Sequence, residues 1–339
     1  MSRSKPTIED VARAAGVSRA TVSRVINNVP GASGQLRARV HEAVAELGYM
    51  PNQTARALAS GRQRAVDVVA VTYSPATGWL GTHPYYSRVL AGIMSVLEGA
   101  GVQLRVHAVG EAGAAEAIDA IAANVTVGAV LTNITPVLAA RFHRRCRRAI
   151  SMVATAASVP AVEVDNVGGA YAAVEQLYRL GRRRIAAIHG PDASTCALDR
   201  RTGYARAVRQ LGLADLGVDG GDFVRENGYV AAGRLLERHP DVDAMFVACD
   251  LMAAGAVQAI TAGGRRVPQD VSVMGFDDSL AAVCSNPPLS TVRVPVEEMA
   301  AAATRLLLDG EVPAGYRQQF PVELVLREST GQPAVPSFL

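Results

Sequence analysis

Three residues near the N-terminus have side chains suited to reading DNA bases. Arg19, Ala20 and Arg24 fall within the first turns of a short helical pattern. An arginine can donate two hydrogen bonds to a guanine edge, and a methyl group can contact a thymine methyl. Nearby hydroxyl and amide groups suit phosphate oxygens, which position a protein without reading the sequence. The pattern predicts a DNA-binding face made of Thr7, Ser18, Arg19, Ala20, Thr21, Ser23, Arg24 and Asn27.

Two short helices with a glycine between them would present these side chains. Thr7 and Asp10 have the spacing of a capping box, Gly16 ends the first helix and Ser18 caps the second. A third helix is expected from Ser33 to Gly48. This arrangement predicts a helix-turn-helix; the alternative is a three-helix bundle with ordinary surface arginines. The apolar residues expected to pack the helices include Val11, Val22, Val25, Leu36, Val40, Val44 and Leu47.

A second group of polar residues follows the apolar strands expected in the rest of the chain. From Val66 onward, short apolar runs alternate with helical stretches, which predicts parallel sheets flanked by helices. Such folds bind ligands beyond the carboxyl ends of the strands. Polar and aromatic residues at those ends predict a pocket for a polyhydroxylated or heterocyclic molecule. The expected strands span residues 66–74, 102–110, 127–134, 148–157, 185–191, 243–250 and 270–278.

These residues do not form a recognisable catalytic set. No nucleophile is paired with an obvious base, and no GxxxxGK[ST] or GxGxxG motif follows an expected strand. Cys146, Cys196, Cys249 and Cys284 form no CxxC pair, so reduced thiols are expected. We therefore predict no enzyme activity, no metal site and no cofactor, only a small-molecule effector.

The charge of the chain is unevenly distributed. Residues 1–64 hold ten basic and four acidic side chains, and the remainder holds 24 basic and 27 acidic ones. A basic head on a mildly acidic body suggests a polyanion-binding module attached to another domain.

No apolar run long enough to cross a membrane and no apolar signal segment is present, which favours a cytoplasmic location.

The N-terminal residues resemble the LacI/GalR repressor family. The resemblance rests on TIEDVARAAGVSRATVSRVIN at residues 7–27 and on YMPNQTARAL at residues 49–58. It implies that the second segment is a hinge helix, with Leu58 wedged into the minor groove of bent DNA. From the pattern alone, Leu58 could equally pack on its own domain. The residues that the resemblance adds to the DNA-binding set are Asn52, Ala55, Leu58 and Ala59.

The resemblance extends over the body of the chain, to about residue 330. It rests on segments such as LGRRRIAAIHGP at 180–191 and VPQDVSVMGFDD at 267–278. It implies a core similar to periplasmic sugar-binding proteins, in which two α/β lobes joined by three crossovers enclose an effector. Asp250 is expected to cap the helix that follows it, and Asp278 to be structural. The effector contacts implied by the resemblance are Tyr85, Tyr86, Asp165, Ser194, Arg200, Phe223 and Asp277.

Three departures from the family pattern leave the effector open. Cys249 replaces a frequent asparagine, Val294 replaces a frequently polar residue, and the stretch Tyr73–Pro84 is long and contains Trp79. Trp79 could cover the ligand or lie on a surface loop. A sugar or a related metabolite is therefore the expected effector class. Which sugar it is, and whether it weakens or strengthens DNA binding, stay open at this point.

The expected chain is an α/β protein with a helix-turn-helix head. We assign residues 1–50 to the DNA-binding domain, 51–64 to the hinge helix and linker, 65–330 to the effector-binding core and 331–339 to a tail. Lobe 1 is expected at about 65–162 and 291–318, and lobe 2 at about 163–290 and 319–330. The predicted function is effector-controlled repression by a homodimer at a pseudo-palindromic operator. A transport-associated sugar-binding protein and a sugar-acting enzyme are the alternatives.

Overall fold

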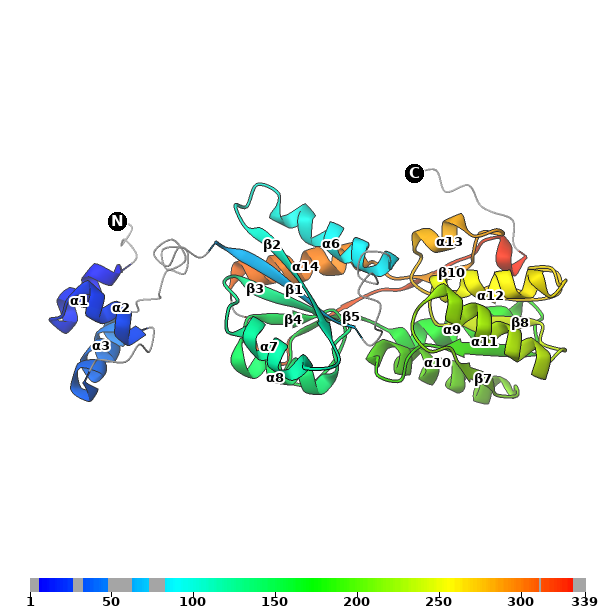
Figure 1. Ribbon diagram of the computed structural model, residues 1–339, viewed down its shortest axis with the longest axis horizontal. Coiled ribbons are helices and arrows are strands. Elements are labelled where there is room, and N and C mark those ends of the chain that lie inside the picture. Colours follow the sequence, from blue (N-terminus) through cyan, green and yellow to red (C-terminus); the bar gives the residue numbers. More distant parts are fainter. Residues whose placement is uncertain (1–5, 27–32, 48–62, 73–82, 311, 332–339) are drawn as a thin grey trace. The chain divides into compact units, whose positions relative to one another are not determined.

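The computed structural model describes residues 6–26, 33–47, 63–72, 83–310 and 312–331. The chain divides into two compact units, residues 1–64 and residues 65–339. The mixed α/β class predicted from the sequence is confirmed, with helices only in the described part of the first unit and parallel sheets in the second. Figure 1 shows the elements of each unit.

The head consists of α1 (Ile8–Ala15), α2 (Arg19–Ile26) and α3 (Gly34–Leu47). The predicted capping box is confirmed, because Thr7 accepts from the Asp10 backbone N–H while the Asp10 carboxylate accepts from the Thr7 N–H at 2.9 Å. Gly16 ends α1 in the left-handed conformation, at φ 62°. The buried core is formed by Val11, Ala12, Ala15, Val22, Val25, Val40 and Ala43.

The packing of α3 differs from the expected one. Leu47 is 36% exposed, and Leu36 and Val44 are only half-buried. Ala43 is buried instead, and Arg39 donates to the carbonyl of Ala15 at 2.6 Å. The helix is therefore rotated so that a small residue approaches α1, and an arginine supplies a donor to the carboxyl end of that helix.

The first lobe of the core contains a six-stranded parallel sheet in the order β11-β5-β4-β3-β1-β2. Its strands are β1 (Ala65–Thr72), β2 (Gln103–Gly110), β3 (Gly128–Thr132), β4 (Ala149–Ser151), β5 (Ala161–Val164) and β11 (Arg317–Phe320). Helices cover both faces of this sheet: α6 (Pro84–Leu97), α7 (Ala114–Ala122), α8 (Pro136–Arg145) and α14 (Val296–Asp309).

The residues of β1 explain this layering. Val66 and Val68 belong to the same apolar cluster as α6 and α14, whereas Val69 and Val71 pack with α7 and α8. The whole strand is buried. Apart from Asp67, which pairs with Arg105 and His107, and the final Thr72, the strand is apolar throughout, as a parallel strand covered on both faces requires.

The second lobe contains a four-stranded parallel sheet in the order β7-β6-β8-β9. Its strands are β6 (Ile185–His189), β7 (Leu216–Asp219), β8 (Ala244–Val247) and β9 (Ser272–Met274). Two helix pairs pack closely, α9 (Asn166–Arg179) with α10 (Thr195–Leu211) and α11 (Arg225–Arg238) with α12 (Asp250–Ala262).

Three chain segments connect the lobes. The first joins β5 to α9, and the second leaves α13 (Leu280–Cys284) and runs through β10 (Thr291–Arg293) into α14. The third leads from β11 into β12 (Glu323–Val325), which pairs antiparallel with β10, and on to a short helix, Glu328–Thr330. Ser329 donates to the Val273 carbonyl at 2.6 Å, which fixes this end of the chain to the second lobe.

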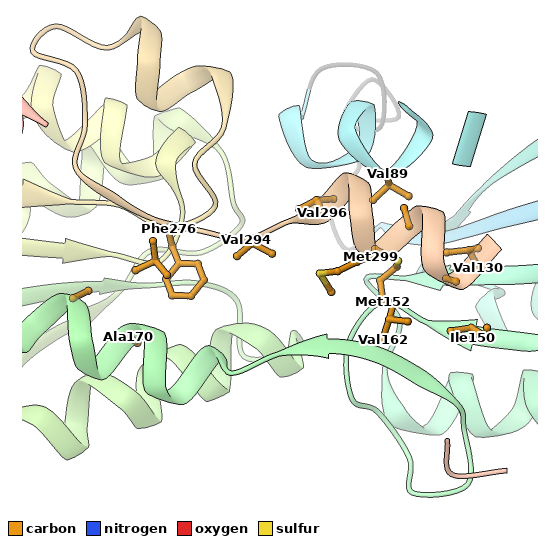
Figure 2. Close-up of a cluster of buried hydrophobic side chains, with 14 of the residues drawn as sticks. Val89, Val130, Ile150, Met152, Val162, Ala170, Phe276, Val294, Val296 and Met299 are labelled. Carbon is orange, nitrogen blue, oxygen red and sulfur yellow. The ribbon is translucent and has the colours of Figure 1, made fainter. Parts of the chain in front are cut away.

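One apolar cluster extends through both lobes. Figure 2 shows Phe276 of the second lobe, Val294 on the second connection and Met299 of α14 as parts of it. All three are buried, and Val294 is only 4% exposed. The interior of the core is therefore continuous from one lobe to the other.

Candidate functional sites

The exposed face of α2 carries the predicted base-reading side chains. Arg19, Ala20 and Arg24 are exposed, and Thr21 and Ser23 are half-buried. Arg19 lies 3.2 Å from Glu9, but both side chains are more than half exposed. An exposed ion pair contributes little to stability, so the Arg19 guanidinium can exchange this partner for DNA at low cost.

Two of the predicted phosphate contacts also hold the helix ends. Ser18 accepts from the Thr21 backbone N–H at 3.2 Å, and its hydroxyl lies 2.9 Å from the Thr21 hydroxyl. The Thr7 hydroxyl donates to Asp10 at 2.7 Å. Predicted contacts that lie outside the described residues are Asn27, Asn52, Ala55, Leu58 and Ala59.

A pocket lies where the two lobes of the core meet. It encloses about 770 Å³ of atom-free space, with its open mouth included. Six of the seven effector contacts implied by the resemblance line it: Tyr85, Tyr86, Ser194, Arg200, Phe223 and Asp277. The loop that contains Trp79 lies outside the described residues.

Arg200 is the central charged group of this pocket. Its Nε donates to Asn166 at 3.0 Å, its Nη1 donates to the Ala248 carbonyl at 2.6 Å, and its Nη2 lies 3.1 Å from Asp277 Oδ1. Its guanidinium also lies 3.8 Å from the centre of the Phe276 ring. Arg200 is only 6% exposed, so these contacts hold it in one orientation.

Asp277 balances the charge of Arg200. Its side chain is 12% exposed, and burial raises the pKa of its carboxyl while the Arg200 charge opposes that rise. Its backbone is in the left-handed region at φ 112°, fixed by a hydrogen bond from its N–H to the Val292 carbonyl at 2.8 Å. Because a cation and an anion face each other, the pair adds no net charge to the pocket.

Asp165 does not line the pocket, unlike its neighbour Asn166. Asp165 is exposed and accepts from the Gly168 N–H at 2.7 Å, which caps α9. Asn166 is buried, lines the pocket and contacts Arg200. The strand end at Val164 indicated polar residues here, but not which of two adjacent side chains turns inward.

Asp250 does not cap α12, contrary to the sequence prediction. The helix begins at Asp250 itself, and its carboxylate accepts from the Ser279 N–H at 2.7 Å and from the Thr291 hydroxyl at 2.6 Å. The side chain thus joins α12 to the segments on either side of α13. Burial, followed by the nearby charge of Asp277, raises the pKa of Asp250 to about 7.

Asp278 has the structural role that was expected. It lies 2.7 Å from Arg293 on β10 and 2.6 Å from Arg327 after β12. The guanidinium groups lower the pKa of its carboxyl against the opposing effect of burial. Asp278 therefore holds together two of the segments that connect the lobes.

The aromatic side of the pocket includes a histidine that the sequence analysis missed. Tyr85 and Tyr86 are edge-to-face at 5.3 Å, and His83 lies beside Tyr86 at 6.0 Å. Burial lowers the pKa of His83 to about 4, so its ring is neutral at pH 7. His83 precedes α6 and accepts from the Tyr85 N–H at 3.2 Å; a cap position before Pro84 was the only signal for it.

Other lining residues had no distinct sequence signal. Apolar side chains come from strand ends, α14 and the second connection, and the Ser194 hydroxyl lies 3.2 Å from the Cys196 sulfur. Only their strand or helix positions, not their types, suggested a ligand. Asn133 and Asn166 stand at strand ends where polar lining was expected, and Val294 is one of the departures from the family pattern; the lining residues missed from the sequence are His83, Ile134, Met152, Val153, Val164, Thr195, Cys196 and Met299.

No group of three or more His, Cys, Asp or Glu side chains among the described residues is arranged to hold a metal ion. Within the same ranges, each helix is too short or too polar to cross a membrane.

Two family models match the chain. Residues 7–52 match the model of bacterial regulatory proteins of the lacI family, and residues 174–330 match the periplasmic binding protein-like domain. The transcriptional regulator CelR of Thermobifida fusca is 36% identical, over 96% of this chain and 99% of the relative. The lactose operon repressor of Escherichia coli K12 is 32% identical, over 96% of this chain and 91% of the relative.

Two solved structures of transcriptional regulators are also similar to this chain over most of its length. The complex of the regulator CelR with cellobiose has a TM-score of 0.69 and 34% identity, covering 96% of this chain and 99% of the other. The lac repressor dimer bound to operator and the anti-inducer ONPF has a TM-score of 0.71 and 29% identity, with the same coverage.

Proposed function

We propose that this chain, which belongs to the lacI family of bacterial regulatory proteins, represses transcription by binding an operator. The occupancy of the operator depends on a ligand in the core pocket. The observation that carries this proposal is the presence of two sites in one chain. One is the exposed face of α2, and the other is the pocket around Arg200 and Asp277. A DNA-binding regulator of this type acts in the cytoplasm.

The DNA target is a pseudo-palindrome bound by a homodimer. The lac repressor relative binds its operator as a dimer, and two-fold protein symmetry calls for matching half-sites. Arg19, Ala20 and Arg24 would read bases, and the hydroxyl groups around them would contact phosphates. The hinge with Leu58 would insert into the minor groove, as the family resemblance implies.

The effector is a neutral, polyhydroxylated molecule. The charge of Arg200 is already compensated by Asp277, and its other two contacts go to Asn166 and Ala248, so it has little capacity left to neutralise an anionic ligand. An uncompensated buried charge would be costly. Phe223 and the two tyrosines offer apolar faces to a sugar ring, and hydroxyl and amide groups offer hydrogen bonds. The CelR relative binds cellobiose, so a saccharide of this kind is our first candidate.

Operator selection followed by ligand titration tests the proposal. The preferred site would be selected from random DNA, and its affinity measured by fluorescence anisotropy with cellobiose and a panel of neutral saccharides. We expect a two-fold symmetric site and at least one saccharide that changes its affinity. A flat response to the whole panel would exclude the regulatory part of the proposal.

An Arg24→Ala variant tests the α2 face independently of the effector. Its binding to the selected site should weaken by about 1–3 kcal/mol, with relaxed preference at one base pair in each half-site. Arg305→Ala, an exposed arginine on α14, is the control that removes the same charge from the core. Equal binding of all bases at every position by wild type would contradict sequence-specific reading.

A further inference from the structure

Arg88 on α6 is the most extensively bonded arginine near the pocket, although it does not line it. Its Nε and Nη2 donate to the two carboxylate oxygens of Glu297, each at 2.7 Å. This is a bidentate pair between α6 and α14, the two helices that cover one face of the first-lobe sheet. The Arg88 side chain is only 17% exposed.

The same guanidinium reaches the segments that connect the lobes. Its Nη1 donates to the Asp277 carbonyl at 2.7 Å, and its Nη2 donates to the Val294 carbonyl at 2.9 Å. Arg88 therefore joins α6 and α14 to the backbone at the end of the second-lobe sheet and to the second connection. A planar guanidinium fixes such contacts in direction as well as distance.

Asp277 and Val294, the two carbonyl partners, are themselves pocket residues. The Asp277 carboxylate lies against Arg200 inside the pocket, while its carbonyl faces Arg88 outside it. A ligand that donates hydrogen bonds to the Asp277 carboxylate must act on a residue whose backbone is held at φ 112°. Any reorientation of that residue would change the contact that it makes with Arg88.

We propose that Arg88 is the positioning residue that couples occupancy of the pocket to α6 and α14. The inference rests on the proposed function and adds the route by which the first lobe responds to the ligand. Because Arg88 does not touch the ligand space, its loss removes the coupling and leaves ligand binding largely intact. Coupling of this kind is measured as the ratio of operator affinities with and without ligand.

The test uses the full-length chain and the variants Arg88→Gln and Arg88→Lys. Cellobiose, or the panel saccharide that shifts operator affinity, is titrated by calorimetry, and operator affinity is measured with and without saturating ligand. We expect Arg88→Gln to keep ligand affinity within about threefold and to reduce the coupling ratio by at least about fivefold. Arg88→Lys retains the charge but not the bidentate geometry, so it should restore part of the ratio.

Arg141→Gln is the matched control. Arg141 forms a similar bidentate pair, with Asp119 at 2.9 and 2.7 Å, but that pair joins α7 and α8 on the other face of the sheet. This variant should keep the wild-type ratio. If Arg88→Gln also keeps it, or if ligand affinity falls as much as the ratio, the inference is wrong. A wild-type ratio of one would instead overturn the proposed function, and the inference with it.

Discussion

Arg200 and Asp277 form a buried ion pair in the lining of the pocket. Both side chains are almost fully buried, at 8% and 12% exposure, and each compensates the other's charge. The Arg200 guanidinium has little freedom to move, because Asn166 and Ala248 also accept from it. The Asp277 carboxylate is therefore the group we expect to accept hydrogen bonds from ligand hydroxyls.

An Asp277→Asn substitution should weaken effector binding by at least about tenfold, because hydrogen bonds to charged groups contribute about 1.5–3 kcal/mol. It should also lower the free energy of unfolding by about 3 kcal/mol, because Arg200 is left buried without its counterion. Calorimetric titration and urea unfolding measure the two effects. Asp165→Asn is the control, since Asp165 is exposed and asparagine also caps helices. Equal losses in the two variants would argue against a ligand role for Asp277.

Asp250 should make stability depend on pH. Its pKa of about 7 in the folded chain exceeds the unfolded value of about 3.9, so the folded chain retains a proton that the unfolded chain has lost between these values. Stability should therefore fall as pH rises through this window, by up to about 1.4 kcal/mol per pH unit. In Asp250→Asn this contribution is absent. Urea unfolding of both proteins gives the free energy of unfolding, and the wild-type value minus the variant value should fall from pH 5 to 7 and stay level above pH 8. A difference that rises with pH would contradict the raised pKa of Asp250.

The close packing of α11 and α12 depends on two glycines. A β-carbon at Gly228 would overlap the backbone of Met252, and one at Gly255 would overlap the backbone of Arg225. Neither neighbour is a flexible side-chain end, so the helices would have to separate. Gly233 lies in the same helix as Gly228 with open space around it, so a glycine's position inside a helical pattern does not by itself predict close approach.

A Gly228→Ala substitution should lower the free energy of unfolding by about 1–3 kcal/mol through overpacking. Gly233 lies on the same helix with open space around its α-carbon, so Gly233→Ala should raise stability by roughly 0.5–1 kcal/mol. Thermal unfolding followed by circular dichroism distinguishes the two signs. If both substitutions stabilise the chain, α11 and α12 are not in the described contact.

Long apolar elements were predictable from the sequence, and short polar ones were not. The buried strands β3, β6 and β8 fall within runs that the apolar pattern identified, and β1 begins one residue before its run. The strand β11 has the sequence RQQF and pairs with β5, more than 150 residues earlier in the chain. Three- and four-residue strands such as β7, β10 and β12 lack a usable alternation, because their positions depend on partners distant in the chain.

The same physical limit applies to the pocket. Arg200 and Asp277 were identified through family resemblance, and the structure places both in the lining. Asn166 in place of Asp165, and the buried contacts of Asp250 with Ser279 and Thr291, depend on side-chain directions and on non-local neighbours. The local sequence pattern carries no information about the direction of a side chain or about neighbours that are distant in the chain.

The apolar clusters indicate how the whole chain should unfold. One cluster is shared by both lobes and passes through Val294, as Figure 2 shows, whereas seven buried residues in the described part of the head form a cluster of their own. Elements that share a continuous core tend to unfold together, and small cores provide little stability. The two lobes are therefore expected to form one cooperative unit despite their separate sheets.

Differential scanning calorimetry of the full chain should show a weak transition from the head and one large transition from the core. The fragment 65–339 should keep only the large one, with an unchanged midpoint and with calorimetric and van't Hoff enthalpies that agree. A saturating effector should raise this midpoint and leave the head transition unaffected, because binding stabilises only the unit that contains the pocket. Two separate core transitions, of which effector raises the midpoint of only one, would mean that the lobes do not unfold cooperatively through the cluster that contains Val294.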